Sequence, residues 1–229
     1  MIISHRHKSI FIHIPKTAGS AVTVALAPCL GPFVIRVGAL YDCLRAGVWP
    51  NFRTCLDMMH PRAIRALLRA LSNRDMKMLL QAQKRRYHFL ADGRAHAGAD
   101  TISANYPEAW ADYYRFCFVR NPFERMVSYY LWLKRRHNYR DFRAYLETVS
   151  YKPQYMLEGR VAVDFVGRYE NLVADFSHVC KQIGISSADS LPIVKKGPDY
   201  SYREYYGPLE RRMVEDIWGE EIERFGYSF

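Results

Sequence analysis

The chain has 229 residues, of which 49% are hydrophobic, so it can bury a core of its own and is too apolar for a disordered segment. Its 33 Lys and Arg against 23 Asp and Glu give a formal charge of +10. That charge favours an anionic partner: a nucleotide, a nucleic acid, a polyanionic glycan or a membrane surface. The five cysteines contain no Cys-x-x-Cys pair, which argues against a disulfide framework or a zinc ribbon and fits a reducing compartment.

The first apolar run, SIFIHI at residues 9–14, predicts a buried strand that ends at Pro15. A helix is expected to begin near Gly19 or Ser20, and FVIRV at 33–37 is a candidate second strand. The first run is too short for a signal peptide or a membrane span, so we expect a soluble, cytoplasmic protein without a membrane span.

Residues 38–86 differ in character from the rest of the chain, and within 60–86 the apolar residues have helical spacing. Ser72 and Asn73 form a break within this pattern. The segment is therefore interpreted as a helical insertion on a sheet scaffold, shaping the acceptor side of a site. A short strand is expected within 87–96, followed by a polar loop that contains His96.

The segment 113–136 repeats the order of the opening one, with a strand at Phe116–Val119, a turn at 120–122 and a helix. A further strand is expected within 161–169, and helices are expected at 170–184 and 208–225. Strands that alternate with helices predict an α/β fold with a mostly parallel central sheet flanked by helices. Ligands of such sheets bind beyond the carboxyl ends of the strands, and the whole chain, 1–229, is expected to form one domain.

The turn PKTAGS between the first strand and its helix has the features of a phosphate site. The start of a helix offers unpaired backbone N–H groups and a positive dipole end. Lys16 adds a charge, Thr17 and Ser20 add hydroxyl donors, and Ala18 and Gly19 allow close approach of the backbone. The lysine stands first in the turn, unlike in the Walker pattern, so a kinase or NTPase is disfavoured. An ordinary strand–helix turn is the alternative.

Arg120 and Ser128 form a second candidate site, with Arg120 at the end of a strand and Ser128 on the next helix. Helical side chains lean toward the N-terminus, so Ser128 can point to an anion held by Arg120. The alternative is that Arg120 pairs with Glu124 and that Ser128 only fills a helix face.

HIPKTAGS and FVRNPFERMVSYY together resemble the 5′-phosphosulfate loop and the 3′-phosphate motif of sulfotransferases that use 3′-phosphoadenosine 5′-phosphosulfate (PAPS), especially the family 2 carbohydrate sulfotransferase branch. PQYMLEGRVAVDFVGRYENLVADF and DIWGEEIERFGYSF are similar to later segments of that family. The resemblance implies a P-loop-like three-layer fold and in-line, metal-independent transfer of a sulfuryl group from PAPS to a hydroxyl of a carbohydrate or glycoconjugate. The excess positive charge of the chain suits an anionic acceptor.

The resemblance also implies roles for individual residues. Lys16 would contact the leaving phosphate, surrounded by the backbone of 17–19 and the Ser20 hydroxyl, while Arg120 and Ser128 would hold the 3′-phosphate. VKKGPDYSYREYY resembles the family's loop over that phosphate. It supplies further candidates: Lys195, Lys196 and Arg203.

The catalytic base should lie between the two motifs. RAHAGADTI resembles the family's His-x-[Ser/Thr]-Ala pattern, which favours His96, although Gly98 replaces the hydroxyl residue. His88 and Asp92 remain alternatives, and His13 is expected to be a core or supporting residue.

Two other functions remain as alternatives. A non-catalytic protein could keep the nucleotide fold and bind an anionic polymer. A nucleic-acid role ranks third and is not expected, because the basic residues are spread along the chain without a recognisable module.

Overall fold

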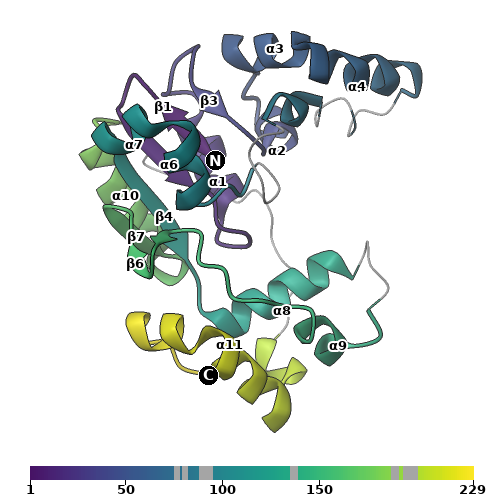
Figure 1. The fold of residues 1–229 in the computed structure, drawn as a ribbon, viewed down its shortest axis with the longest axis vertical. Helices are drawn as coiled ribbons and strands as arrows, with labels where there is room; N and C mark the ends of the chain where they lie inside the picture. Colours follow the sequence, from purple (N-terminus) through teal and green to yellow (C-terminus); the bar gives the residue numbers. More distant parts are fainter. Residues whose placement is uncertain (75–77, 79–81, 88–94, 135–138, 187–190, 193–200) are drawn as a thin grey trace.

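The structure is a computed structural model that describes residues 1–74, 78, 82–87, 95–134, 139–186, 191–192 and 201–229 (Figure 1). A five-stranded sheet with the order β3-β1-β2-β4-β7 forms its centre. Its strands are β1 (Ile2–Ser4), β2 (Ser9–Ile12), β3 (Ile35–Arg36), β4 (Tyr114–Val119) and β7 (Phe165–Arg168). β2, β4 and β7 pair in parallel, whereas β1 is antiparallel to both of its neighbours. Four of the five strands therefore run in one direction, as the sequence predicts for a mostly parallel sheet.

Helices cover both faces of this sheet. The α-helices are α1 (Gly19–Leu26), α2 (Leu40–Arg45), α3 (Phe52–Met59), α4 (Pro61–Ser72), α6 (Ala99–Asn105), α7 (Pro107–Asp112), α8 (Pro122–Leu133), α9 (Phe142–Leu146), α10 (Leu172–Gln182) and α11 (Pro208–Phe225). The 3₁₀ helices are η1 (Ala82–Tyr87), η2 (Tyr169–Asn171) and η3 (Tyr202–Tyr205). Within the described residues, no helix combines the length and the apolar character that crossing a membrane requires.

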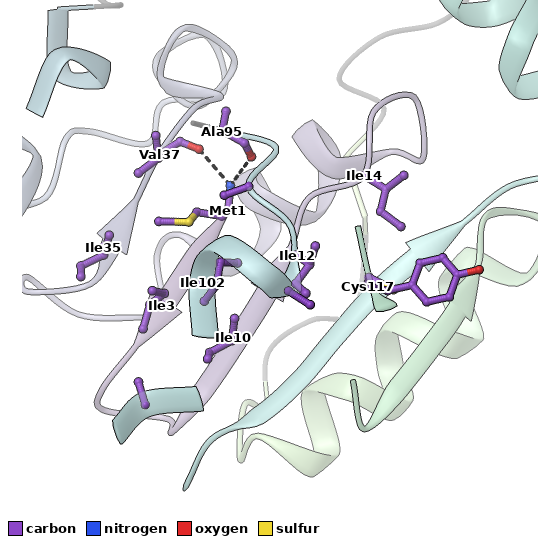
Figure 2. Close-up of a cluster of buried hydrophobic side chains, with 14 of the residues drawn as sticks. Met1, Ile3, Ile10, Ile12, Ile14, Ile35, Val37, Ala95, Ile102 and Cys117 are labelled. Carbon is purple, nitrogen blue, oxygen red and sulfur yellow. Dashed lines mark hydrogen bonds between the residues drawn. The ribbon is translucent and has the colours of Figure 1, made fainter. Parts of the chain in front are cut away.

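Alternate residues of the central strands enter two separate cores. Ile10 and Ile12 of β2 pack in the cluster that includes α6 and α7, which Figure 2 shows in close-up. Phe11, between them, packs with α1 and α10 on the other face. Because both faces of the sheet are buried, these strands are continuous apolar runs, which is why the sequence predicts them correctly.

The insertion is helical, as its spacing predicts, and extends beyond the edge strand β3 (Figure 1). It contains α2, α3, α4 and η1, and α4 ends at Ser72 with Asn73 as its C-cap, at the predicted break. Of the strand expected within 87–96, residues 88–94 lie outside the described residues. Tyr87 belongs to η1, not to a strand.

The sequence prediction misses the strand β1 and a small hairpin. β1 was not predicted, because three residues at the start of the chain carry too little pattern for a strand. The strand expected within 161–169 is present as β7 (Phe165–Arg168), but Val161 belongs instead to β6 (Arg160–Val161), which pairs with β5 (Met156–Leu157) in a small hairpin. Glu158 and Gly159 have positive φ, the backbone of a tight hairpin turn.

A third cluster of buried side chains joins α8, α9 and α11, at the bottom of Figure 1. An ion pair is buried beside it, with Arg125 Nη1 3.0 Å from Glu221 Oε1 and side chains 5% and 1% exposed. The Arg125 guanidinium also lies 4.2 Å from the Trp218 ring centroid. Burial raises the pKa of the Glu221 carboxyl, although the arginine opposes this. Arg125 thus braces α8 against α11.

Removing one member of this pair should strongly destabilise the fold. We expect Glu221→Ala to lower the free energy of unfolding by about 3–5 kcal/mol, because it leaves the Arg125 charge buried without its partner. The matched control is Glu220→Ala, because Glu220 is 51% exposed and its pair with Arg224 contributes about 1 kcal/mol or less. Thermal unfolding followed by circular dichroism measures both, and equal effects would contradict the bracing role.

Candidate functional site

The loop between β2 and α1 lies at the carboxyl end of a central parallel strand, where the sequence places the first phosphate site. Lys16 and Ala18 both adopt left-handed backbone conformations, with φ of 67° and 61°. Such conformations cost roughly 1 kcal/mol or more for residues other than glycine and concentrate at functional sites. Alternation of left-handed residues turns successive N–H groups to one side, which is the geometry of anion-binding nests. The helix begins at Gly19, as predicted.

Both hydroxyl groups of this loop have protein acceptors. Thr17 is fully buried and its Oγ1 donates to the carbonyl oxygen of Ile14 at 2.9 Å. This differs from the expectation that the Thr17 hydroxyl faces a ligand, and it leaves the Thr17 backbone N–H as the candidate contact. The Ser20 hydroxyl donates to Asp42 Oδ2 at 2.8 Å. Asp42 lies on α2, so the insertion is tied to the loop by a contact that the sequence did not predict.

Gly19 is required for space. A Cβ atom at this position would lie 1.9 Å from His13 Cδ2, because the His13 ring lies against the backbone here. The same ring stacks on Phe11, with centroids 5.8 Å apart, and meets the His96 ring edge-on at 4.5 Å. His13 therefore supports the loop and the neighbouring histidine, in keeping with the supporting role expected for it.

His96 lies beside the first loop although 80 residues separate them. Its Nδ1 is 2.8 Å from the His13 carbonyl oxygen, which can only accept, so Nδ1 carries the proton and Nε2 of the neutral ring has the lone pair. Burial lowers the pKa of His96 to about 4, against the opposing effect of that hydrogen bond. The preceding residue is held in the core, where the Ala95 carbonyl accepts from the Met1 backbone nitrogen at 2.6 Å (Figure 2).

Arg120 joins the second motif to the first. Its Nε and Nη2 donate to Glu124 Oε2 at 3.2 and 3.0 Å, and its Nη1 donates to the Lys16 carbonyl oxygen at 3.4 Å. The guanidinium also lies 4.1 Å from the Tyr169 ring centroid. The pairing with Glu124, one of the two interpretations of this residue, is thus present. These bonds use three of the five N–H groups that a guanidinium offers.

Ser128 lies on α8, one turn beyond Glu124, and is half-buried. Residues four apart share a helix face, so its side chain is on the face that carries the Arg120–Glu124 pair. Pro122 begins α8, and the side chain of Asn121 caps it by accepting from the Phe123 N–H at 3.0 Å. The structure therefore brings Lys16, Arg120 and Ser128 to the same edge of the sheet.

Arg203 is the one remaining candidate that lies within the described residues. Lys195, Lys196, His88 and Asp92 lie outside the described residues. Arg203 donates to the Phe229 carbonyl oxygen at 3.2 Å and packs against aromatic rings near the end of the chain.

Tyr169 is a site residue that sequence reasoning missed. β4 and β7 pair in parallel with Val119 opposite Arg168, so the next residues, Arg120 and Tyr169, leave the sheet together. One signal was available in the sequence: the predicted strand at 116–119 is followed by Arg120, and the strand expected within 161–169 ends in Arg168 and Tyr169. The cation–π contact follows from the register, which the sequence alone does not give.

The fold and this edge define a three-layer α/β protein in which two strand–turn–helix units meet beyond the carboxyl ends of parallel strands. The chain belongs to the sulfotransferase family, whose family model matches residues 1–228. An uncharacterized protein of Archaeoglobus fulgidus is 39% identical over 83 residues, which are 32% of this chain and 69% of that protein. No solved structure gives a significant match.

A side chain at position 19 should destabilise the loop between β2 and α1. We expect Gly19→Ala to destabilise the protein by about 1–3 kcal/mol, because the new methyl group must displace the His13 ring. Gly219→Ala is the matched control. It lies within α11 with open space around it and should stabilise by about 0.5–1 kcal/mol. Denaturant unfolding measures both, and a neutral Gly19→Ala would contradict the close packing described here.

Proposed function

We propose that this member of the sulfotransferase family transfers the sulfuryl group of PAPS to a hydroxyl of a carbohydrate or glycoconjugate, in line and without a metal ion. The observation that carries the proposal is the bond from Arg120 to the Lys16 carbonyl, because it joins two anion-binding candidates into one site. The family membership supports the same reaction class. The proposal treats residues 1–229 as one sulfotransferase domain.

The donor set of this edge fits a ligand with two separate phosphate groups. Lys16 and the N–H groups of Thr17, Ala18 and Gly19 would surround the 5′-phosphate, with the Ser20 hydroxyl next to them. Arg120 and Ser128 would hold the 3′-phosphate. A guanidinium that keeps donors beyond its bonds to Glu124 can still bind a phosphate oxygen. Lys195 and Lys196 are proposed as further contacts of the 3′-phosphate.

His96 is proposed as the general base. When bound, PAPS supplies the sulfuryl group and adenosine 3′,5′-bisphosphate as leaving group. The acceptor oxygen forms a bond to sulfur as the bond between sulfur and the 5′-phosphate oxygen breaks, and Nε2 of His96 takes the hydroxyl proton. The Nδ1 bond to the His13 carbonyl supports this role, since it fixes the ring with Nε2 unprotonated. Lys16 would neutralise charge on the departing phosphate.

The formal charge of +10 supports an acceptor that is itself anionic. We infer a reducing, cytoplasmic compartment, which suits the five free thiols of the chain. The insertion is proposed to shape the acceptor side, since α2 contacts the loop through Asp42 and Ser20.

Transfer of labelled sulfate from PAPS to a panel of hydroxyl acceptors tests the proposal directly. Wild type should transfer, and His96→Ala should lower the rate by about 10²–10⁴-fold, the usual contribution of a general base. Lys16→Ala should lower it by about 10²–10³-fold through lost charge stabilisation. His178→Ala and Lys181→Ala, which change exposed residues of α10, are the matched controls and should stay near wild type.

The pH dependence adds a signature specific to His96. A base must be neutral, and this imidazole is neutral above its pKa of about 4. The acidic limb of kcat/KM should therefore fall near pH 4, not near the ordinary histidine value. Absence of transfer to every acceptor, with adenosine 3′,5′-bisphosphate still bound, would favour the non-catalytic binding protein.

Glu124 provides a test of the 3′-phosphate assignment. The carboxylate holds the Arg120 guanidinium and would repel a phosphate beside it. We expect Glu124→Gln to tighten binding of adenosine 3′,5′-bisphosphate by about 3–10-fold, corresponding to roughly 1 kcal/mol for a partly exposed pair. Binding of ADP, which lacks the 3′-phosphate, should change little.

Isothermal titration calorimetry of both nucleotides measures this difference, with Glu215→Gln on α11 as the control for a surface carboxylate paired with arginine. An equal change for ADP and adenosine 3′,5′-bisphosphate would remove the assignment of Arg120 to the 3′-phosphate.

A further inference from the structure

Large apolar side chains are exposed mainly in one part of the chain. Of the thirteen that stand out among the described residues, ten lie between residues 33 and 78. Trp49 is 80% exposed, Met59 68% and Phe33 63%. Apolar exposure of this kind, gathered in one segment, marks an interaction surface more often than scattered single residues do.

α3 has its polar side buried and its apolar side exposed. Phe52, Leu56 and Met59 follow helical spacing, and their exposed fractions are 53%, 45% and 68%. The buried side carries Thr54 and Asp57. Both have partners inside the protein, since Asp57 accepts from Arg53 Nε and the Tyr87 hydroxyl, and Thr54 donates to Asn51. The outward direction of the apolar side is therefore fixed by satisfied buried bonds.

α4 combines an exposed apolar stripe with arginines. Ile64, Leu68 and Leu71 are 39%, 60% and 54% exposed, while Ala63 and Ala70 face the protein. Its three arginines, at 62, 65 and 69, are also exposed, and the helix contains no acidic residue. An amphipathic helix with a basic polar side and an exposed apolar side is typical of helices that lie in the interface of a membrane.

The charge of the whole segment 33–74 is one-sided. It contains seven arginines and two acidic residues, Asp42 and Asp57. Both acidic side chains are buried, 8% and 3% exposed, and both are hydrogen-bonded within the protein. The exposed charge of this segment is therefore entirely positive, and it accompanies the apolar side chains of α3 and α4.

We propose that the exposed side chains of residues 33–74, named here the insertion surface, dock the protein on a lipid bilayer that contains anionic phospholipids. The arginines would bind lipid phosphates, and the apolar stripes would enter the interface. A second copy of this chain fits less well, because it would bring arginines against arginines. α3 and α4 lie at the periphery of the molecule, beyond β3, where a flat surface can approach them (Figure 1).

Vesicle co-sedimentation of the full chain tests this docking. The protein should bind phosphatidylcholine vesicles that contain about one-third phosphatidylglycerol, bind pure phosphatidylcholine vesicles weakly, and be released by salt. Leu68→Glu should lower the partition coefficient by more than about tenfold. Arg65→Gln with Arg69→Gln should lower it by about fivefold for each arginine.

Matched controls come from other exposed positions. Val173→Glu, at a side chain 71% exposed on α10, and Arg211→Gln with Arg212→Gln on α11 should leave vesicle binding within about twofold of wild type. Vesicle binding that does not depend on anionic lipid, or that Leu68→Glu leaves unchanged, would overturn the proposal. So would a dimer in sedimentation velocity that Leu68→Glu dissociates, if vesicles are not bound. The measurement needs no sulfate transfer, so its failure is distinguishable from failure of the proposed reaction.

Discussion

The Arg120 guanidinium is the contact on which the candidate site depends. It binds Glu124 in the first turn of α8, the Lys16 carbonyl of the first loop and the face of Tyr169. Each partner follows a different parallel strand or belongs to the helix after it, so one side chain connects the ends of β2, β4 and β7. A planar group with five donors and a polarizable face can make these three kinds of contact at once.

Contacts within the protein hold the loop between β2 and α1 in its conformation. The Thr17 hydroxyl closes the loop onto Ile14, and the His13 ring occupies the space that a side chain at Gly19 would fill. The left-handed residues at 16 and 18 are costly conformations that these contacts maintain. The backbone N–H groups are therefore arranged before an anion arrives, and little of the binding free energy is lost in ordering the loop. His96 is arranged in advance in the same way, because a hydrogen bond to the His13 backbone carbonyl sets its tautomer.

The sequence was sufficient for the elements with strong local patterns and insufficient for the contacts between them. The apolar runs of β2 and β4 and the spacing in α10 and α11 predict those elements, because both faces of the sheet and one face of each helix are buried. β1 is too short to carry a pattern, and β5 and β6, on either side of the turn at Glu158 and Gly159, have only two residues each. Motif order led to Lys16, Arg120 and Ser128, but the bond from Ser20 to Asp42 depends on tertiary packing that no local pattern encodes.

The insertion also shows that local patterns do not predict tertiary contacts. In addition, it connects the proposed sulfotransferase site with the proposed docking surface. Helical spacing predicts that the insertion contains helices such as α4, yet it does not say which side of a helix is buried. In α3 the polar side is buried, because Asn51, Arg53 and Tyr87 satisfy it. Asp42 on α2 of the same insertion accepts a hydrogen bond from the Ser20 hydroxyl, so the insertion is joined to the loop that carries Lys16. The part of the chain proposed to dock on a bilayer and the loop proposed to bind the 5′-phosphate are therefore in direct contact through α2.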